Sequence, residues 1–191
     1  MSSQKPSWWA LVKHRPIAVS SMSSTLPVVV NRVLIGRHAK TITVTRTSIY
    51  EFAGGDQAFL ALATAFHERC LEDPDLNHVF SHHSNPGHVE NLAAYWAEVL
   101  GGPPSYSRLH GGHSAMLEIH AREGGESLEP NFVACFVQAL DDAQLPDDPD
   151  FRASLRAYIE WATKDLVTYM APESVVPPDQ PMPRWSWDGP K

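Results

Sequence analysis

The sequence predicts an all-α domain, and three observations support this prediction. Between Thr47 and Met170, apolar residues recur at spacings of three and four, the repeat of helices that bury one face. Glycines and prolines separate these segments, as they do between helices. Alternation typical of a strand occurs only in "TITVT", residues 41–45. With 43% hydrophobic and 19% charged residues, the chain has the composition of a globular protein.

The first half of this domain should contain three helices. A short helix over 48–53 should end at Gly54 and Gly55, and the next should span 56–73 with Asp56 as its N-cap. Segment 75–85 has no clear period and is expected to be a connector. A helix over 86–100 follows, with Ser84 or Asn85 as its cap. The residues expected on the buried faces are Phe59, Leu62, Ala63, Phe66, Cys70, Val89, Leu92, Trp96 and Val99.

Three more helices are expected in the second half. Segment 104–112 should be a loop, and a short helix should cover 113–121 and stop at Gly124 and Gly125. A helix over 130–143 has Pro130 in its first turn, and the longest helix should span 148–170. The residues expected on the buried faces are Phe132, Phe136, Ala139, Leu140, Leu155, Tyr158, Ile159, Ala162, Leu166 and Tyr169.

The charge is divided unevenly along the chain. Residues 1–50 carry seven Lys or Arg and no acid, whereas the remainder carries eight basic and 22 acidic side chains, a balance of 8 − 22 = −14. We expect residues 1–46 to be a basic, disordered extension, with Met22 as an alternative start that would make residues 1–21 an artefact. An acidic domain is a poor match for nucleic acid. We expect the domain itself to span 47–171.

Other features bear on the compartment and on the tail. No apolar run reaches eighteen residues, so no membrane span is expected. Cys70 and Cys135 indicate two buried thiols rather than a disulfide framework, as in the cytoplasm. The proline-rich tail, 172–191, should be extended, and Trp185 and Trp187 should dock it on the domain.

Histidines raise the question of function, because eight of the ten lie between His67 and His120. A zinc hydrolase would need a pattern such as His-Glu-x-x-His, which does not occur. A nucleophilic enzyme would need a Gly-x-Ser-x-Gly turn or a cysteine in polar surroundings, and neither is present. His120 follows Met116 by one helical turn, so it is either a haem ligand among apolar neighbours or a histidine of the core.

From Ser48 to about Met170 the chain resembles the group II truncated haemoglobins. The matching stretches are "IYEFAGG", "FLALATAFHERCLEDPDLNHVF", "HVENLAAYWAEVLGGPPSY" and "MLEIHA", in this order and at this spacing. This resemblance implies a truncated globin-like, two-over-two helical sandwich with irregular N- and C-terminal extensions. It also implies haem b (iron protoporphyrin IX) as the cofactor.

Residue by residue, His120 matches the histidine that binds the iron. His67 and His88 match ligand-side positions and are expected to carry any catalytic step. Two positions depart from the family pattern: His67 stands where most members have tyrosine, and Phe132 where tryptophan is usual. Phe132 has no N–H, so polar contact with a bound ligand should depend on the two histidines. The expected haem contacts are Phe80, Leu92, Tyr95, Trp96, Tyr106, Met116 and Phe132.

The resemblance implies a haem protein that binds O₂ or other diatomic ligands, for oxygen storage or transport. Alternatives are an enzyme for NO dioxygenation or peroxide reduction, with a separate reductase, and a redox or sensor haem in which His67 or His88 also binds the iron. A non-haem, histidine-rich metal binder is a further alternative. The expected ligands are O₂, NO, CO or peroxide, and a homodimer is left open. The remaining histidines of the domain, expected at the surface, are His78, His82, His83, His110 and His113.

Overall fold

The computed structural model describes residues 46–82, 86–122 and 128–191, and within them the all-α prediction is confirmed. The expected extension, apart from Arg46, and the stretch 41–45 lie outside the described residues. The described helices are α1 (Ile49–Ala53), α2 (Asp56–Glu72), α3 (Asn77–His82), α4 (His88–Val99), α5 (Ser105–His110), α6 (Gly112–His120), α7 (Glu129–Asp142) and α8 (Pro149–Val167). A two-stranded antiparallel pair follows, β1 (Trp185–Ser186) and β2 (Gly189–Pro190).

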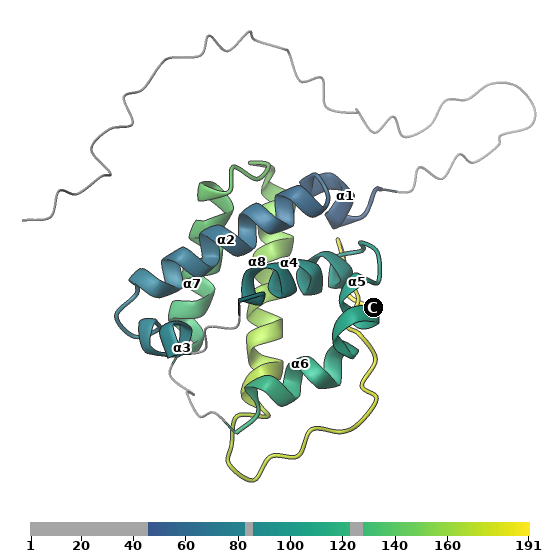
Figure 1. Cartoon of the computed structure of the whole chain (residues 1–191). Coiled ribbons are helices and arrows are strands. Elements are labelled where there is room, and N and C mark those ends of the chain that lie inside the picture. The colour runs from purple at the N-terminus through teal and green to yellow at the C-terminus, as the bar shows by residue number, and fades with distance from the viewer. Residues whose placement is uncertain (1–45, 83–85, 123–127) are drawn as a thin grey trace, which may run out of the picture. The chain divides into compact units, whose positions relative to one another are not determined.

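Four long helices form the body of the domain in two layers. Helix α2 packs against α4 and α7, and α7 packs against α8. In Figure 1, α2 and α4 lie across α7 and α8, which is the expected two-over-two arrangement. The interior is made by the apolar stripes predicted from the helical repeat. Fully buried members of these stripes include Phe59, Leu62, Phe66, Val99, Phe136, Leu140, Leu155 and Tyr158.

Glycine and a capping box define the first helix and attach it to α4. Ser48 accepts a hydrogen bond from the Glu51 backbone and donates its own N–H to the Glu51 carboxylate, so both ends of the capping box form. Gly54 ends the helix at φ 112°, in the left-handed region. Tyr50 of α1 donates its backbone N–H to the carbonyl of Leu100, directly after α4, at 3.0 Å. A Cβ on Gly102 would lie 2.8 Å from the Tyr50 ring, so only glycine allows this close approach.

Several element boundaries differ from the expectation. Segments 77–82 and 105–110 are the six-residue helices α3 and α5, which are too short to display a helical repeat in the sequence. Gly55, not Asp56, is the N-cap of α2, because Asp56 already lies in the helix and accepts a hydrogen bond from Tyr50 Oη at 2.9 Å. Helix α4 starts only at His88, after Gly87, which leaves Pro86 in the preceding turn.

The expected cap of α4 was wrong, because Gly87, and not Ser84 or Asn85, is its N-cap. The expected terminators Gly124 and Gly125 lie outside the described residues. Helix α6 ends at His120, where Ala121 adopts an extended conformation. The longest described helix is α8, as expected, although it ends at Val167 rather than Met170.

Both cysteines are buried, in accordance with the expectation of core thiols. Cys70 on α2 is fully buried and Cys135 on α7 nearly so. Burial raises the pKa of each thiol above its ordinary value, and the thiols therefore stay protonated near neutral pH. They contribute to packing in the manner of small apolar side chains.

The tail docks on the domain through both tryptophans. The Trp185 side chain is buried, and its Nε1–H donates to Ser154 Oγ at 3.2 Å. The Trp187 Nε1–H donates to the carbonyl of Thr47 at 2.7 Å, and the Arg46 guanidinium lies 3.4 Å from the Trp187 ring centroid. The tail therefore contacts the first half of α8 and the segment before α1.

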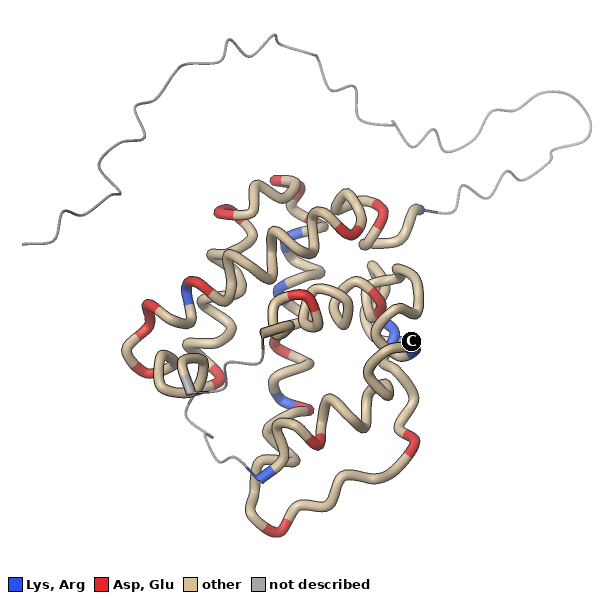
Figure 2. Tube along the Cα trace, in the orientation of Figure 1, with Lys and Arg blue, Asp and Glu red and all other residues tan. Residues whose placement is uncertain are grey.

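Acidic residues are spread along the helices of the described domain rather than gathered in one place (Figure 2). No helix within residues 46–82, 86–122 and 128–191 is both long and apolar enough to cross a membrane.

Candidate functional site

Three predicted site residues from three helices form one cluster. His67 comes from α2, Phe80 from α3 and His88 from the first position of α4. The His67 ring centroid lies 5.7 Å from that of Phe80 and 5.3 Å from that of His88, and the Phe80 and His88 centroids are 5.9 Å apart. We call these three residues the His–Phe cluster. The structure thus places the two histidines expected on the ligand side beside Phe80, one of the expected haem contacts.

A turn between α2 and α3 places Phe80 in this cluster. Asp73 ends α2, and its carboxylate accepts hydrogen bonds from the backbone N–H groups of Asp75 and Leu76 at 2.9 and 3.1 Å. Leu76 is buried at the start of this return. The side chain of Asn131 on α7 also donates to Asp73. The chain therefore folds back, and α3 packs against α2.

One imidazole of the cluster is incompletely satisfied. The Nδ1 atom of His67 is buried, and among the described residues it has no hydrogen-bond partner. A buried polar atom without a partner typically costs about 1–3 kcal/mol. Such an atom is suited to bond a ligand that enters the cluster.

Aromatic rings support the cluster from the core side. The Phe132 ring lies 4.8 Å from the Phe66 ring and 6.4 Å from the Phe80 ring, measured between centroids. Trp96 on α4 lies 5.3 Å from Phe66. Phe66 was expected only as a core residue, but its ring connects the core to the site. The half-buried Leu92 and Phe132 complete the apolar surroundings.

His120 is the last residue of α6, and its ring is fixed by its own helix. Its Nδ1 lies 2.8 Å from the carbonyl oxygen of Met116. Because a carbonyl can only accept, Nδ1 must carry the proton and donate it. The neutral ring then has an unprotonated Nε2, whose lone pair can bind a metal. The Met116 side chain is half-buried and packs against the main core.

Tyr95 and Tyr106 form a second group with a histidine that was expected at the surface. His113 is only 7% exposed, so this expectation was wrong. Its Nδ1 is hydrogen-bonded to Tyr95 Oη at 2.8 Å, and its Nε2 lies 3.6 Å from an Asp165 carboxylate oxygen. The Tyr106 ring lies 5.1 Å from Tyr95. These contacts explain how a histidine can be buried, because both ring nitrogens have polar neighbours.

The other histidines are distributed as follows. His78 and His110 are exposed, as expected. His83 and the side chain of His82 lie outside the described residues.

Acid should destabilise the domain through His113. Burial lowers the pKa of His113 below its ordinary value of 6.5, outweighing the opposing influence of Asp165. A neutral His113 therefore stabilises the fold above about pH 6.5, and this contribution is lost as pH falls through the lowered pKa. Urea denaturation at pH 7.5 and 5.5 should show a smaller loss of stability for His113→Gln than for the wild type. The exposed control, His110→Gln, should lose as much as the wild type; equal losses in all three proteins would contradict the assignment.

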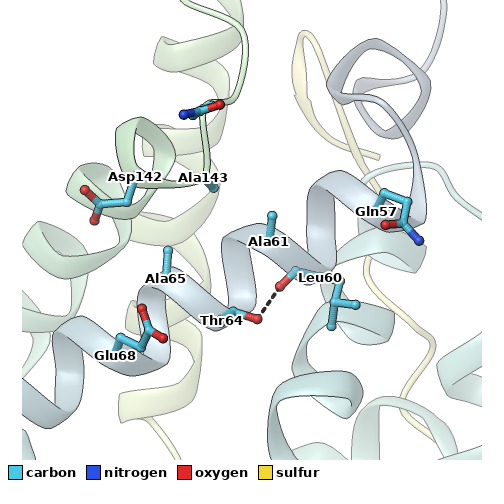
Figure 3. Close-up of a pocket in the computed structure, with 9 residues that line it drawn as sticks. Gln57, Leu60, Ala61, Thr64, Ala65, Glu68, Asp142 and Ala143 are labelled. Atoms are coloured by element: carbon cyan, nitrogen blue, oxygen red, sulfur yellow. Dashed lines mark hydrogen bonds between the residues drawn. The ribbon is translucent and has the colours of Figure 1, made fainter. Parts of the chain in front are cut away.

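A shallow groove lies elsewhere, on the outer side of α2 beside the end of α7 (Figure 3). Thr64 Oγ1 donates there to the Leu60 carbonyl at 2.8 Å, within the helix itself. The candidate site contributes no residue to this groove. The lining residues are Gln57, Leu60, Ala61, Thr64, Ala65, Glu68, Asp142, Ala143 and Gln144.

The two-over-two helices define a globin-type fold, in which one histidine lies at the end of α6 and the His–Phe cluster lies on α2, α3 and α4. Residues 48–160 match the model of the bacterial-like globin family. This match covers more than half of the chain, and the chain therefore belongs to that family.

Solved structures support this assignment. A thermostable haemoglobin from the actinobacterium Thermobifida fusca is 28% identical, with a TM-score of 0.53 over 63% of this chain and 97% of that one. The haemoglobin of Chloroflexus aurantiacus is also 28% identical, with a TM-score of 0.54 over 63% and 98% of the two chains. A group II 2-on-2 haemoglobin from Agrobacterium tumefaciens, 24% identical over 65% and 97% of the two chains with a TM-score of 0.55, has the same fold. A comparison with curated protein sequences found no match.

Membership of the globin family implies a haem cofactor. The residues present fit such a group in three respects. His120 offers an unprotonated Nε2, the His–Phe cluster holds a buried imidazole nitrogen of His67 without a partner, and Phe80 and Phe132 provide apolar rings.

Proposed function

We propose that this chain binds haem b through Nε2 of His120 and takes up O₂, or another diatomic ligand, beside the His–Phe cluster. The observation that carries this proposal is the hydrogen bond from His120 Nδ1 to the Met116 carbonyl, at 2.8 Å. This bond fixes the tautomer and restrains the ring before any metal binds, as hydrogen bonds to metal-binding histidines generally do.

The haem, when bound, would supply an iron with an open coordination position for O₂, CO or NO. His67 would donate a hydrogen bond to the ligand, for which its buried Nδ1 is available. His88, 5.3 Å away between ring centroids, would be the second polar group. Phe132 can only limit access of water, since it has no N–H. Phe80 and Phe132 thus make the surroundings apolar, and the two histidines supply the polarity.

The pairing of His67 with His88 favours peroxide reduction or NO dioxygenation as a second candidate function. Two imidazoles in contact allow one ring to accept a proton while its neighbour donates one. Electrons would come from a separate reductase. A redox or sensor haem would instead use one of the two rings as a second iron ligand.

The absorption spectrum of the purified protein tests the proposal. We expect a haem Soret band, a five-coordinate ferrous form and a shift of the band on addition of CO. A low-spin, six-coordinate ferrous form without added ligand would favour the redox or sensor function. Rapid consumption of NO by the oxygenated protein would favour the enzyme over the carrier. A protein that is colourless from haem-replete cells, and does not take up added hemin, would overturn haem binding altogether.

Replacing His67 with Leu should speed the loss of O₂ about tenfold, because a hydrogen bond of this kind contributes roughly 1–1.5 kcal/mol. The substitution puts an apolar side chain of similar size next to Phe80 and removes both ring nitrogens. Flash photolysis and stopped-flow mixing measure the dissociation rate. His78→Leu is the matched control, because His78 is exposed on the neighbouring helix α3. Equal rates in His67→Leu, the control and the wild type would remove His67 from this role.

A further inference from the structure

The apolar face of α6 is covered by the tail. Leu117 is 1% exposed and Ala121 6%, and they form a small cluster with Val176, which is 6% exposed. This cluster is separate from the main core. Val175, the preceding residue in the tail, is 80% exposed. The tail therefore presents one valine to α6 and its neighbour to solvent.

Hydrogen bonds join the tail to both ends of the same helix. Near the start of α6, Ser114 Oγ donates to the Pro177 carbonyl at 3.0 Å and accepts from the Gln180 N–H at 2.8 Å. Just beyond the end of α6, the Arg122 guanidinium donates to the Ser174 carbonyl at 3.1 Å. The contacts therefore span the length of α6, with Val176 between them.

The far end of the tail is fixed on other helices. Trp185 lies between Tyr158 and Trp161 of α8, 5.7 Å from each ring centroid. Trp187 packs edge-on against Phe52 of α1, with centroids 5.1 Å apart. Figure 1 shows the tail, in yellow, running from the end of α8 past α6 toward the C-terminus. The tail is thus attached to the domain on both sides of α6.

We propose that residues 171–191 act as a strap that positions α6, and through it His120. This inference rests on the proposed haem function. Helix α6 has nine residues, too few for an isolated helix to be stable in water, so packing must hold it. The His120 ring is hydrogen-bonded to the Met116 carbonyl of the same helix, so a displacement of α6 moves the ring as well. Val176 and Ser114 are therefore positioning residues for His120.

The test compares Val176→Ala with Val175→Ala, two identical changes at adjacent positions of opposite exposure. Three quantities are measured: the rate of haem loss to an apoglobin acceptor, the iron–histidine stretching band by resonance Raman, and hydrogen exchange of the α6 amides in the haem-free protein. Val176→Ala should lose haem about tenfold faster, shift the band and increase α6 exchange, because it empties part of the cluster under α6. Val175→Ala should match the wild type in all three.

A third variant separates positioning from general stability. Leu145→Ala removes a side chain that is 6% exposed in the main core, in a cluster that includes neither Leu117 of α6 nor Ala121 just beyond this helix. It should lower the unfolding midpoint without shifting the iron–histidine band. The strap is disproved if Val176→Ala and Val175→Ala behave alike, or if Leu145→Ala shifts the band as much as Val176→Ala. A wild-type protein that takes up no hemin would instead refute the haem function itself.

Discussion

His120→Ala is expected to abolish tight haem binding, with a loss of affinity greater than roughly 100-fold. The reason is that His120 is the proposed iron ligand, and removing even an outer partner of a metal ligand typically costs about 10–100-fold in affinity. The fold should survive, because His120 is half-buried at the end of a short helix and is absent from both apolar clusters. Titration with hemin, followed at the Soret band, measures the affinity.

Two comparisons make this result specific. His110→Ala changes an exposed histidine at the end of the neighbouring short helix α5, and it should bind hemin as the wild type does. Free imidazole added to His120→Ala should restore part of the binding, because it can occupy the space left by the missing ring. If His120→Ala bound hemin with wild-type affinity and an unchanged spectrum, the iron ligand would have to be another residue.

Most of the fold could be predicted from the sequence, because in a long helix the apolar residues of the buried face recur several times at helical spacing. Phe59, Leu62 and Phe66 recur at helical spacing, and all three are buried. Gly54 marks the end of α1 through its left-handed backbone, a constraint that sequence alone indicates. The short helices α3 and α5 could not be predicted in this way. A helix of six residues contains too few positions for a helical repeat to be recognised. Such a helix depends on packing against the rest of the domain, as the buried Leu76 directly before α3 shows.

The site was predicted less completely, because burial of a polar residue depends on partners distant in the sequence. His113 was expected at the surface, yet Tyr95 and Asp165, from two other helices, surround it. Nothing in the local pattern "HGGHSA" indicates these partners. The grouping of His67 with His88 was implied only by the family resemblance; in the structure their ring centroids lie 5.3 Å apart. The contact of Val176 with α6 has no local signal at all.

Phe66→Ala should destabilise the domain by about 3–5 kcal/mol, the usual cost of removing a buried phenylalanine. Phe66 is fully buried, and its ring contacts four others edge-on. These four rings are Phe80, Trp96, Phe132 and Phe136, at centroid distances of 5.9, 5.3, 4.8 and 6.2 Å. Each such pair adds about 0.5–1.5 kcal/mol to the effect of burial. A loss of this size is a large part of the 5–15 kcal/mol that stabilises a typical domain.

Urea denaturation of the haem-free protein, followed by circular dichroism, measures this loss, and Leu60→Ala on the same helix is the control. Leu60 is 39% exposed and should cost far less. The substitution should also disturb the candidate site, because the rings of Phe80 and Phe132 both pack against the Phe66 ring. Hemin affinity should therefore fall in Phe66→Ala even under conditions where the protein stays folded. A variant as stable as Leu60→Ala would mean that the rings can repack around the missing side chain, and Phe66 would then not be the residue that joins the core to the site.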